Sequence, residues 1–389
     1  MSNVAPVSSA ASAAPTEPLV LVRRAGAITH VTLNRPRAIN ALSMEMFQLL
    51  AHALRDVRSE VTSDAARPAA SASAAILLDG AGERGFCGGG DIKELSGKDA
   101  HRILALEYAV DHWVATAPVP VVAVMDGIAM GGGIGLGGHA THRIVTERSR
   151  LAMPEARIGI VPDVGGHLLL ARAPGRLGEL LAVTAGEMGA ADAIALGFAD
   201  FFIPSERLPE LREALAAGES ADAVCARLAE PAPGATPVRD AASWWDAIAE
   251  GALGGGPGAV AADPAAAAAR LVSALEASVE PDAVATAVTV RAMCPTSAAV
   301  TLAQLERTRA LGLDLAAVLT DDLRVLGRLA PQPNFAEGVR AQVIDKDRNP
   351  SWVPATIEEL DPAELAAILD PELAPGEAPL DLDPELPAR

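Results

Sequence analysis

The sequence predicts an α/β fold with an appended C-terminal helical region, and two apolar runs carry this prediction. Residues 74–79 and 121–125 have the length and composition of buried strands. Each run leads to a glycine-rich turn, at residues 80–90 and 131–133, and then to a segment of helical character. Alternating strands and helices are typical of α/β proteins. With 389 residues, of which 50% are hydrophobic and 21% charged, the chain can bury a large core.

The other elements of the first half are predicted from the spacing of their apolar residues. Two more strands are expected at residues 19–22 and 28–33, and helices at residues 41–57, 99–117, 177–185 and 189–197. Residues 59–73 are polar and alanine-rich, which indicates a linker. Beyond Pro204 the composition shifts. Residues 230–237 and 251–268 are rich in Pro, Gly and Ala, which indicates mobile connections between helices.

These patterns divide the chain into four parts. We expect a disordered lead at residues 1–17, a core at 18–205, a helical region at 206–360 and an acidic, proline-rich tail at 361–389. The composition of the tail predicts disorder. The lead has neither a basic region nor an apolar core, and no apolar run approaches the roughly 18 residues of a membrane helix. We therefore expect a cytoplasmic protein.

Charge and cysteine usage exclude several classes of partner. The formal net charge is −19 and the pI is near 4.8, so we expect neither nucleic acid nor an anionic membrane as a partner. Cys87, Cys225 and Cys294 are widely separated and odd in number, which predicts free thiols. His139 and His142 are predicted to face the same way on one helix. No third ligand is evident, so we expect no metal.

The turn at residues 131–133 suits a ligand oxygen that carries or develops negative charge. A glycine-rich turn before a helix leaves main-chain N–H groups unpaired. Gly133, Gly135 and Gly138 match the G-x-G-x-x-G pattern of dinucleotide folds, with Glu155 downstream. Close packing of a helix on a sheet is a third interpretation. The second glycine turn favours acyl chemistry, because two loops can aim two N–H donors at one carbonyl oxygen.

Three motifs carry a family resemblance. GERGFCGGGDIKEL begins at Gly82, MDGIAMGGGIGL at Met125 and MPEARIGIVPDVGG at Met153. In this order and spacing they resemble the enoyl-CoA hydratase/isomerase superfamily, also called the crotonase superfamily. The resemblance covers roughly residues 18–205 and implies a spiral of ββα units.

The appended region carries a narrower resemblance. Residues 293–360, with the stretches FAEGVRA and IDKD, resemble the C-terminal region of the 3-hydroxyisobutyryl-CoA hydrolases. Ordinary hydratases of the superfamily end sooner and lack this region. The resemblance therefore implies an acyl-CoA thioesterase rather than a hydratase.

The resemblance also implies a set of site residues. It places the two oxyanion N–H donors on Gly90 and Gly132 and the catalytic carboxylate on Glu155. Asp163 stands where the hydrolases have an Asp, and we expect it to orient the substrate hydroxyl or Glu155. The expected substrate-binding residues are Gly88, Asp91, Ile92 and Glu107.

One position departs from the hydratase pattern. Hydratases of the superfamily have a Glu three residues after the middle glycine of the second loop, where this chain has Gly135. A pair of carboxylates can position a water and shuttle its protons across a double bond. With Glu155 alone, thioester hydrolysis remains feasible, because it requires one nucleophile or base and an oxyanion hole. Glu155 would either activate water or attack the thioester carbonyl itself.

We therefore predict a hydrolase that converts 3-hydroxyisobutyryl-CoA and water to 3-hydroxyisobutyrate and CoA, by resemblance a step of valine breakdown. The alternatives are an enoyl-CoA hydratase or isomerase and a non-catalytic CoA-binding protein of the same fold. No separate cofactor is expected, because CoA is part of the substrate. The phosphates of CoA would meet cationic side chains in the motif loops, namely Arg35, Arg37, Arg84 and Lys93. Homo-oligomerisation is left open.

Overall fold

The structure is a computed structural model that describes residues 17–62, 73–97, 99–256 and 258–387. The predicted lead, apart from its last residue, lies outside the described residues. The same holds for most of the predicted linker at residues 59–73, whose first residues belong to a helix.

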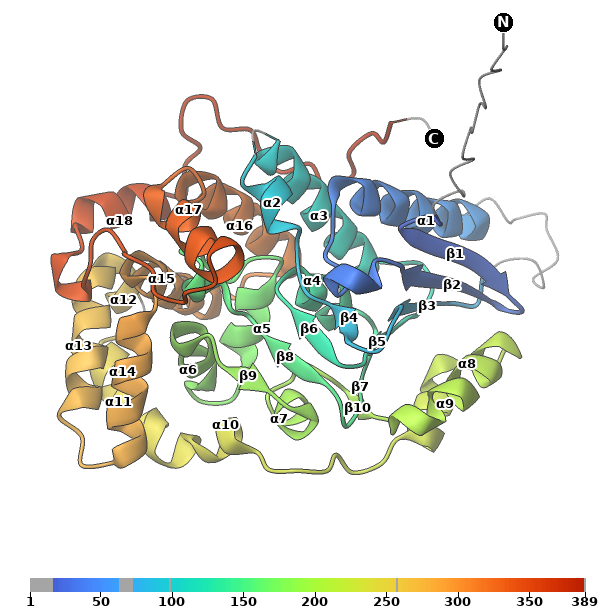
Figure 1. The fold of residues 1–389 in the computed structure, drawn as a ribbon, viewed down its shortest axis with the longest axis horizontal. Helices are drawn as coiled ribbons and strands as arrows, with labels where there is room; N and C mark the ends of the chain where they lie inside the picture. The colour runs from blue at the N-terminus through green and yellow to red at the C-terminus, as the bar shows by residue number, and fades with distance from the viewer. Residues whose placement is uncertain (1–16, 63–72, 98, 257, 388–389) are drawn as a thin grey trace, which may run out of the picture.

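Two sheets form the spiral part of the molecule (Figure 1). The larger sheet has the order β1-β2-β3-β5-β7-β10 and the smaller one β4-β6-β8-β9. Their strands are β1 (Val20–Ala25), β2 (Ile28–Leu33), β3 (Ala75–Gly80), β4 (Gly85–Cys87), β5 (Val121–Met125), β6 (Ile128–Met130), β7 (His142–Val145), β8 (Arg150–Ala152), β9 (Glu187–Met188) and β10 (Phe201–Phe202). The consecutive pairs β3–β4, β5–β6 and β7–β8 each place one strand in each sheet. Each repeat of the spiral thus contributes one strand to each sheet, as the predicted ββα units require.

Helices connect and cover these strands. The helices of the spiral are η1 (Pro36–Ala38), α1 (Met44–Thr62), α2 (Ile92–Leu95), α3 (Ala100–Ala115), α4 (Gly132–Gly138), η2 (Glu155–Arg157), α5 (Gly166–Arg172), α6 (Leu177–Thr184) and α7 (Ala190–Ala195). The predicted helix at 41–57 therefore begins three residues later and runs five residues further, into the predicted linker. Its buried residues recur at helical spacing, so one face packs on the sheet.

Only helices follow β10 in the described part of the chain. They are η3 (Ser205–Arg207), α8 (Leu208–Ala216), α9 (Ala221–Leu228), α10 (Pro237–Asp240), α11 (Ala242–Leu253), α12 (Ala259–Ala262), α13 (Pro264–Glu276), α14 (Pro281–Ala292), α15 (Pro295–Leu311), α16 (Leu315–Leu329), α17 (Pro333–Val339), η4 (Arg340–Ile344), η5 (Ile357–Glu359) and α18 (Pro362–Leu369). Phe47 of α1, Trp245 of α11 and Leu305 of α15 belong to one cluster of buried apolar side chains. The appended helices and the spiral therefore share a core.

The larger sheet is buried on both faces. The odd-numbered residues of β5 face the main core, and the even-numbered ones face a second, smaller core. Helices α8 and α9 supply the other side of this second core (Figure 1). A strand buried on both faces needs a continuous apolar sequence, which is why VVAVM predicts this strand.

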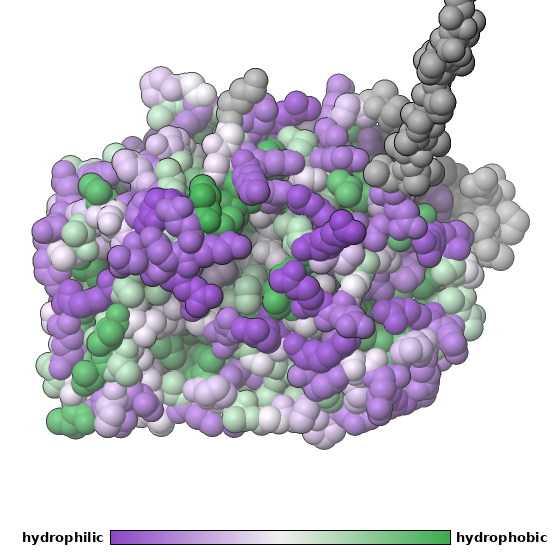
Figure 2. All heavy atoms as spheres, in the orientation of Figure 1, coloured by the Kyte–Doolittle hydropathy of each residue, from purple (hydrophilic) through white to green (hydrophobic). Residues whose placement is uncertain are grey.

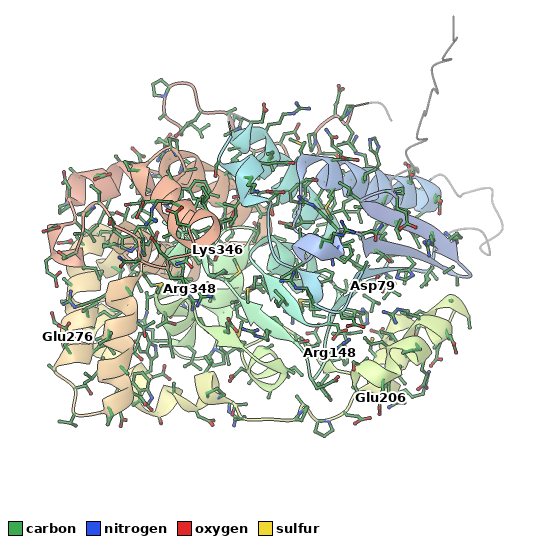
Figure 3. All side chains as sticks on the ribbon, viewed as in Figure 1. Asp79, Arg148, Glu206, Glu276, Lys346 and Arg348 are labelled. Carbon is green, nitrogen blue, oxygen red and sulfur yellow. The ribbon has the colours of Figure 1, made fainter. Side chains whose placement is uncertain are left out.

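A buried carboxylate fastens α8 to this sheet. Asp79 of β3 accepts hydrogen bonds from Arg212 of α8 at 3.1 Å and from Thr32 of β2 at 2.8 Å. Burial acts to raise the pKa of Asp79, but His30, Thr32 and Arg212 together outweigh it, so the pKa lies below its ordinary value. Figures 2 and 3 show the same side of the molecule: the surface is largely hydrophilic, and Asp79 lies near α8.

Two segments differ from the predictions made for them. Residues 251–268, predicted to be a mobile connection, contain α12 and the start of α13. Alanine favours a helix once its end is capped, and Asp263 caps α13 by accepting a hydrogen bond from the Ala266 N–H at 3.0 Å. The prediction for this segment was therefore wrong.

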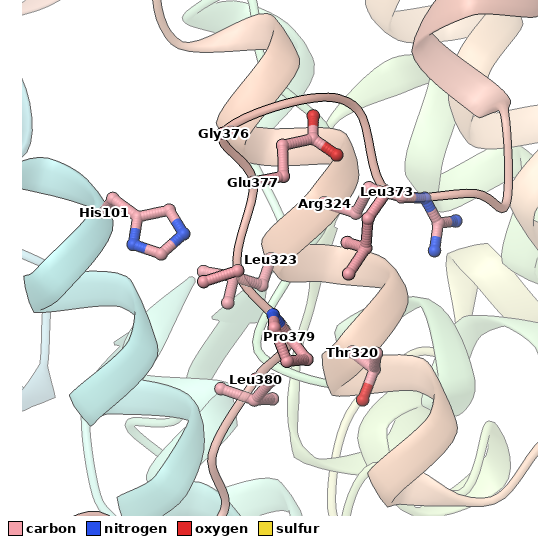
Figure 4. Close-up of a pocket in the computed structure, with 11 residues that line it drawn as sticks. His101, Thr320, Leu323, Arg324, Leu373, Gly376, Glu377, Pro379 and Leu380 are labelled. Atoms are coloured by element: carbon pink, nitrogen blue, oxygen red, sulfur yellow. The ribbon is translucent and has the colours of Figure 1, made fainter.

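The tail is the second difference, because residues 362–369 form α18 and residues 370–387 pack on the protein. Arg328 of α16 donates hydrogen bonds to the carbonyl oxygens of Asp370 at 2.8 Å and Glu372 at 2.7 Å. The indole of Trp113 on α3 donates to the carbonyl oxygen of Leu382 at 2.6 Å. A pocket of about 310 Å³ lies beneath this tail, between His101 of α3 and Leu323 of α16 (Figure 4). Composition alone missed these contacts, which anchor an acidic segment.

No single helix in the described part of the chain is long and apolar enough to cross a membrane. By length and composition, α14 and α15 would do so only as a pair bent by 112°. Most of α15 is buried within the protein, which accounts for its apolar composition.

Candidate active site

The predicted motifs meet at one edge of the smaller sheet. Strands β4 and β6 pair in parallel, and so do β6 and β8. Parallel neighbours present their carboxyl ends at the same edge, where ligands of α/β proteins commonly bind. Residues 88–90 follow β4, residues 131–132 follow β6, and Glu155 follows β8 in η2. The three motifs therefore lie side by side in the folded protein, in the same order as in the sequence.

The two glycine turns touch each other. A Cβ atom added to Gly132 would lie 3.4 Å from the main-chain nitrogen of Gly90, and one added to Gly89 would lie 3.7 Å from the nitrogen of Gly132. Gly89 and Gly131 have φ values of 99° and 50°, which favour glycine. The N–H groups of Gly90 and Gly132 donate to no other group among the described residues. Two adjacent, unpaired donors can therefore serve one ligand oxygen.

Glu155 lies beside these donors. Its carboxyl is buried, and Oε1 would lie 3.0 Å from a Cβ atom added to Gly131. Its other oxygen, Oε2, has no hydrogen-bond partner among the described residues. Burial, aided by the negative charge of Asp163, raises the pKa of Glu155 well above its ordinary value. A carboxyl with a raised pKa and a free oxygen is suited to accept and return a proton near neutral pH.

Helix α3 brings two more acids to the site. Glu107 is buried, and its Oε1 would collide with a Cβ atom on Gly132. One turn further along α3, the carboxyl of Asp111 faces α4, where its Oδ2 would lie 2.6 Å from a Cβ atom on Gly135. Burial raises the pKa of both carboxyls, and nearby acids raise them further. Gly135, which stands where hydratases of the superfamily have a Glu, therefore lies next to the carboxyl of Asp111 in space.

Asp163 lies behind Glu155 and is held by a tyrosine. The hydroxyl of Tyr108 donates a hydrogen bond to Oδ2 of Asp163 at 2.7 Å. Burial and the charge of Asp322 raise the pKa of Asp163 to about 7, although the hydrogen bond from Tyr108 acts in the opposite direction. The carboxyl can therefore change its protonation state near neutral pH.

A pair from the helical region completes this cluster of acids, and sequence reasoning missed it. Asp322 of α16 accepts a hydrogen bond from the Gly165 N–H at 2.9 Å, and its Oδ1 lies 2.8 Å from Nδ1 of His167. Both side chains are fully buried. The one signal in the sequence is that Asp322 lies on the apolar face of an amphipathic helix, beside Leu319 and Leu326.

The remaining predicted binding residues line the outer edge of the site. Gly88 is exposed, and Asp91 and Ile92 are half-buried at the start of α2. Asp91 caps α2 by accepting from the Lys93 N–H at 3.1 Å and pairs with Arg35 at 2.7 Å. The other cations of the motif loops are exposed, namely Arg37, Arg84 and Lys93. Arg35 is thus engaged with the protein, whereas these three face solvent.

The thiol of Cys87 and the imidazoles of His139 and His142 are not placed as catalytic or metal-binding groups in the described part of the chain. Cys87 is fully buried, and burial raises the pKa of its thiol to about 12, so the thiolate is scarce. The prediction that His139 and His142 share a helix was wrong, because His139 caps the end of α4 and His142 begins β7. Among the described residues, no three His, Cys, Asp or Glu side chains are grouped to hold a metal ion.

Comparison with known proteins agrees with this geometry. A family model described as enoyl-CoA hydratase/isomerase matches residues 28–369, which include the appended helices. The chain belongs to this family. A curated relative, the mitochondrial 3-hydroxyisobutyryl-CoA hydrolase of Mus musculus, is 34% identical over 89% of this chain and 87% of its own length. The relative of the same name from Gallus gallus is 32% identical over 88% of this chain and 86% of its own length. Within the enoyl-CoA hydratase/isomerase family, the chain belongs with these hydrolases, as its C-terminal motifs predict.

Solved structures confirm the crotonase fold of this family member. A carnitinyl-CoA dehydratase from Mycobacterium thermoresistibile has a TM-score of 0.79 and 36% identity, covering 93% of this chain and 100% of that one. An enoyl-CoA hydratase from Rhodobacter sphaeroides 2.4.1 has a TM-score of 0.77 and 36% identity, and the match covers 91% of this chain and 97% of the hydratase. Since both matches span nearly the whole chain, they include the appended helical region.

Proposed function

We propose that this protein hydrolyses 3-hydroxyisobutyryl-CoA to 3-hydroxyisobutyrate and CoA. The observation that carries the proposal is the meeting of two unpaired N–H donors, on Gly90 and Gly132, beside the buried carboxyl of Glu155. The curated relatives that match nearly the whole chain are named for this reaction. Their similarity extends through the C-terminal helices, which supply Asp322 to the site.

The geometry supports a two-stage hydrolysis. The thioester oxygen would accept hydrogen bonds from Gly90 and Gly132, which stabilise the negative charge that develops when the carbonyl is attacked. Glu155 would either draw a proton from the attacking water or attack the carbonyl itself, forming an anhydride that water then opens. In both cases the C–S bond breaks, and the CoA thiolate takes up a proton.

Asp163 and Tyr108 are proposed to position the reacting groups. The charge of Asp163 contributes to the raised pKa of Glu155, so the two carboxyls influence each other's protonation. Tyr108 fixes the direction of the Asp163 carboxyl through its hydrogen bond. Gly88, Asp91 and Ile92 would contact the substrate where it leaves the site, with Arg37, Arg84 and Lys93 available to the phosphates of CoA.

Thiol release from 3-hydroxyisobutyryl-CoA tests this proposal. The wild type should release CoA rapidly, and E155Q should be slower by about 100- to 10,000-fold, because loss of a general base typically costs this much. Glu206 is exposed on η3, outside the strands and turns that build the site, so E206Q is the matched control and should match the wild type. Thiol release by E155Q at the wild-type rate would contradict the assignment of Glu155.

Hydration of an enoyl-CoA is the second candidate, and Asp111 favours it. This acid lies next to Gly135, the position where hydratases of the superfamily have a Glu. Crotonyl-CoA separates the two candidates, since loss of its enoyl absorbance without thiol release would indicate a hydratase. A protein that binds CoA tightly and turns over neither substrate would instead be a non-catalytic member of the family.

Location and assembly also belong to this proposal. The sequence predicts a cytoplasmic protein, whereas the curated relatives are named as mitochondrial proteins. Cell fractionation with an antibody against the chain tests it. Light scattering of the purified protein would give its oligomeric state.

A further inference from the structure

Asp111 is an anomaly in the interior of this protein. Its side chain is fully buried, and neither carboxyl oxygen has a hydrogen-bond partner among the described residues. Buried polar groups are nearly always paired, and an unpaired one lowers the stability of the fold. An apolar side chain would pack there at lower cost. The carboxyl is therefore available to pair with a ligand.

The described groups that face Asp111 form no hydrogen bond with it. Glu107 approaches from the same helix, Asp163 from the loop before α5, and Asp322 from α16, and all three are acids. His167 of α5 lies against Asp322, with Nδ1 2.8 Å from Oδ1 of that acid. Burial, followed by the negative charges of these acids, raises the pKa of Asp111 well above its ordinary value, which favours the protonated form. The protonated carboxyl has one donor and one acceptor to offer a ligand.

The position of Asp111 indicates which part of a ligand it would meet. Along α3, Glu107 faces Gly132, and Asp111 faces Gly135 one turn later. Since a helical turn rises about 5.4 Å, the Asp111 carboxyl lies about one turn deeper than the donor on Gly132. The CoA portion is too large to be buried and must leave through the exposed edge near Gly88. The acyl chain therefore points the other way, toward Asp111.

If the thioester oxygen is bound by Gly90 and Gly132, the third acyl carbon, two bonds from the carbonyl carbon, would lie near the first turn of α4, where Asp111 faces Gly135. We propose that Asp111 binds the 3-hydroxyl group of the acyl chain and thereby selects 3-hydroxyacyl thioesters over unsubstituted ones. One carboxyl oxygen, carrying its proton, donates to the hydroxyl oxygen, and the other accepts the hydroxyl proton. Both unpaired atoms of Asp111 gain partners when the substrate binds. This inference rests on the proposed hydrolase function.

Two neighbours fit this assignment. Gly135 must lack a side chain, because a Cβ atom there would lie 2.6 Å from Oδ2 of Asp111 and 2.8 Å from Cβ of Val164. Asp163, the other candidate for the hydroxyl, already accepts the hydrogen bond from Tyr108. Asp111 thus recognises the acyl chain, while Asp163 positions Glu155.

The test compares two substrates that differ only in the hydroxyl, 3-hydroxyisobutyryl-CoA and isobutyryl-CoA. Thiol release gives kcat/KM for each. In the wild type the hydroxylated substrate should be preferred. In D111L this preference should fall by about 10- to 100-fold, through loss of the hydroxylated substrate's kcat/KM alone, because a buried hydrogen-bonded pair is removed. D111N can still donate and accept, so it should keep most of the preference.

Leucine is chosen because it is apolar and removes an unpaired buried group, so D111L should fold and have a melting temperature at or above that of the wild type. Should D111L not fold, D111A carries the same test. An unchanged preference in the variant, or an equal loss for both substrates, overturns the inference and leaves the proposed function standing. No thiol release from 3-hydroxyisobutyryl-CoA by the wild type overturns the proposed function and the inference together.

Discussion

The hydroxyl of Tyr108 donates a hydrogen bond of 2.7 Å to Oδ2 of Asp163, and both side chains are buried. The bond joins α3 to the loop that follows β8 and η2, so it links two of the segments that build the site. It also lowers the pKa of a carboxyl that burial and Asp322 raise to about 7. The protonation state of Asp163 near neutral pH therefore depends in part on this hydroxyl.

Removing this hydroxyl should shift the pH dependence of the reaction. In Y108F, Asp163 loses a donor to its ionised form, so its pKa should rise by about one unit. If hydrolysis uses ionised Asp163, the acidic limb of the kcat/KM profile should move to higher pH by the same amount. Activity at pH 9 should change little, which separates this effect from a loss of folding. An unshifted limb would show that Asp163 does not titrate in the reaction.

The raised pKa of Asp163 also predicts how stability depends on pH. Between its ordinary value of 3.8 and its folded value of about 7, the folded protein holds a proton that the unfolded chain has released. This carboxyl therefore lowers the stability of the fold progressively as pH rises through this window. D163N lacks the titration, so its melting temperature relative to the wild type should rise between pH 4.5 and 7.5. Asp282 is exposed on α14, and D282N should follow the wild type.

A methyl group on Gly132 should block the proposed oxyanion site. It would collide with Oε1 of Glu107 and lie 3.4 Å from the nitrogen of Gly90. We expect G132A to lower kcat by about 100- to 1,000-fold, as for loss of one oxyanion donor. Gly327 of α16 has open space around its Cβ position, so G327A is the control and should retain activity. Equal activity of the two variants would exclude the assigned donor.

Gly135 gives a stability test of the crowding next to Asp111. Alanine normally stabilises a helix relative to glycine by about 1 kcal/mol, and G251A in the open part of α11 should do so. In G135A the added Cβ would lie 2.6 Å from Oδ2 of Asp111, so we expect a loss of about 1–3 kcal/mol instead. Denaturant unfolding measures both. The double variant D111A/G135A should show non-additive recovery, whereas additive effects would mean that the two residues do not compete for space.

The contacts of Arg328 predict that the tail is anchored. R328M removes the hydrogen bonds to the carbonyls of Asp370 and Glu372 and the ion pair with Glu377. Limited proteolysis should then cut residues 370–387 faster, and the unfolding free energy should fall by about 1–3 kcal/mol. Arg239 is exposed and forms an ion pair with Asp240, the next residue, which is also exposed, so R239M should behave as the wild type. Equal cleavage of both variants would contradict the anchoring.

Local patterns predicted the elements that depend on local physics. The run at residues 121–125 is apolar at every position because β5 is buried on both faces, and this is visible in the sequence. The tail was predicted wrongly because its order depends on distant partners, and residues 251–268 were predicted wrongly because the helix cap at Asp263 was overlooked. Arg328 and Trp113 hold the tail, and these residues are separated from it by 42 positions or more.

The sequence by itself determined the family, the order of the motifs and the pairing of Gly90, Gly132 and Glu155 as candidate site residues. These residues follow neighbouring parallel strands, so strand order alone brings them to one edge. Only the tertiary structure decided that Asp111 fills the space beside Gly135 and that Asp322 and His167 lie behind Asp163. These acids come from α3 and α16, and their approach depends on how helices pack over long separations. No periodicity or spacing along the chain encodes that packing.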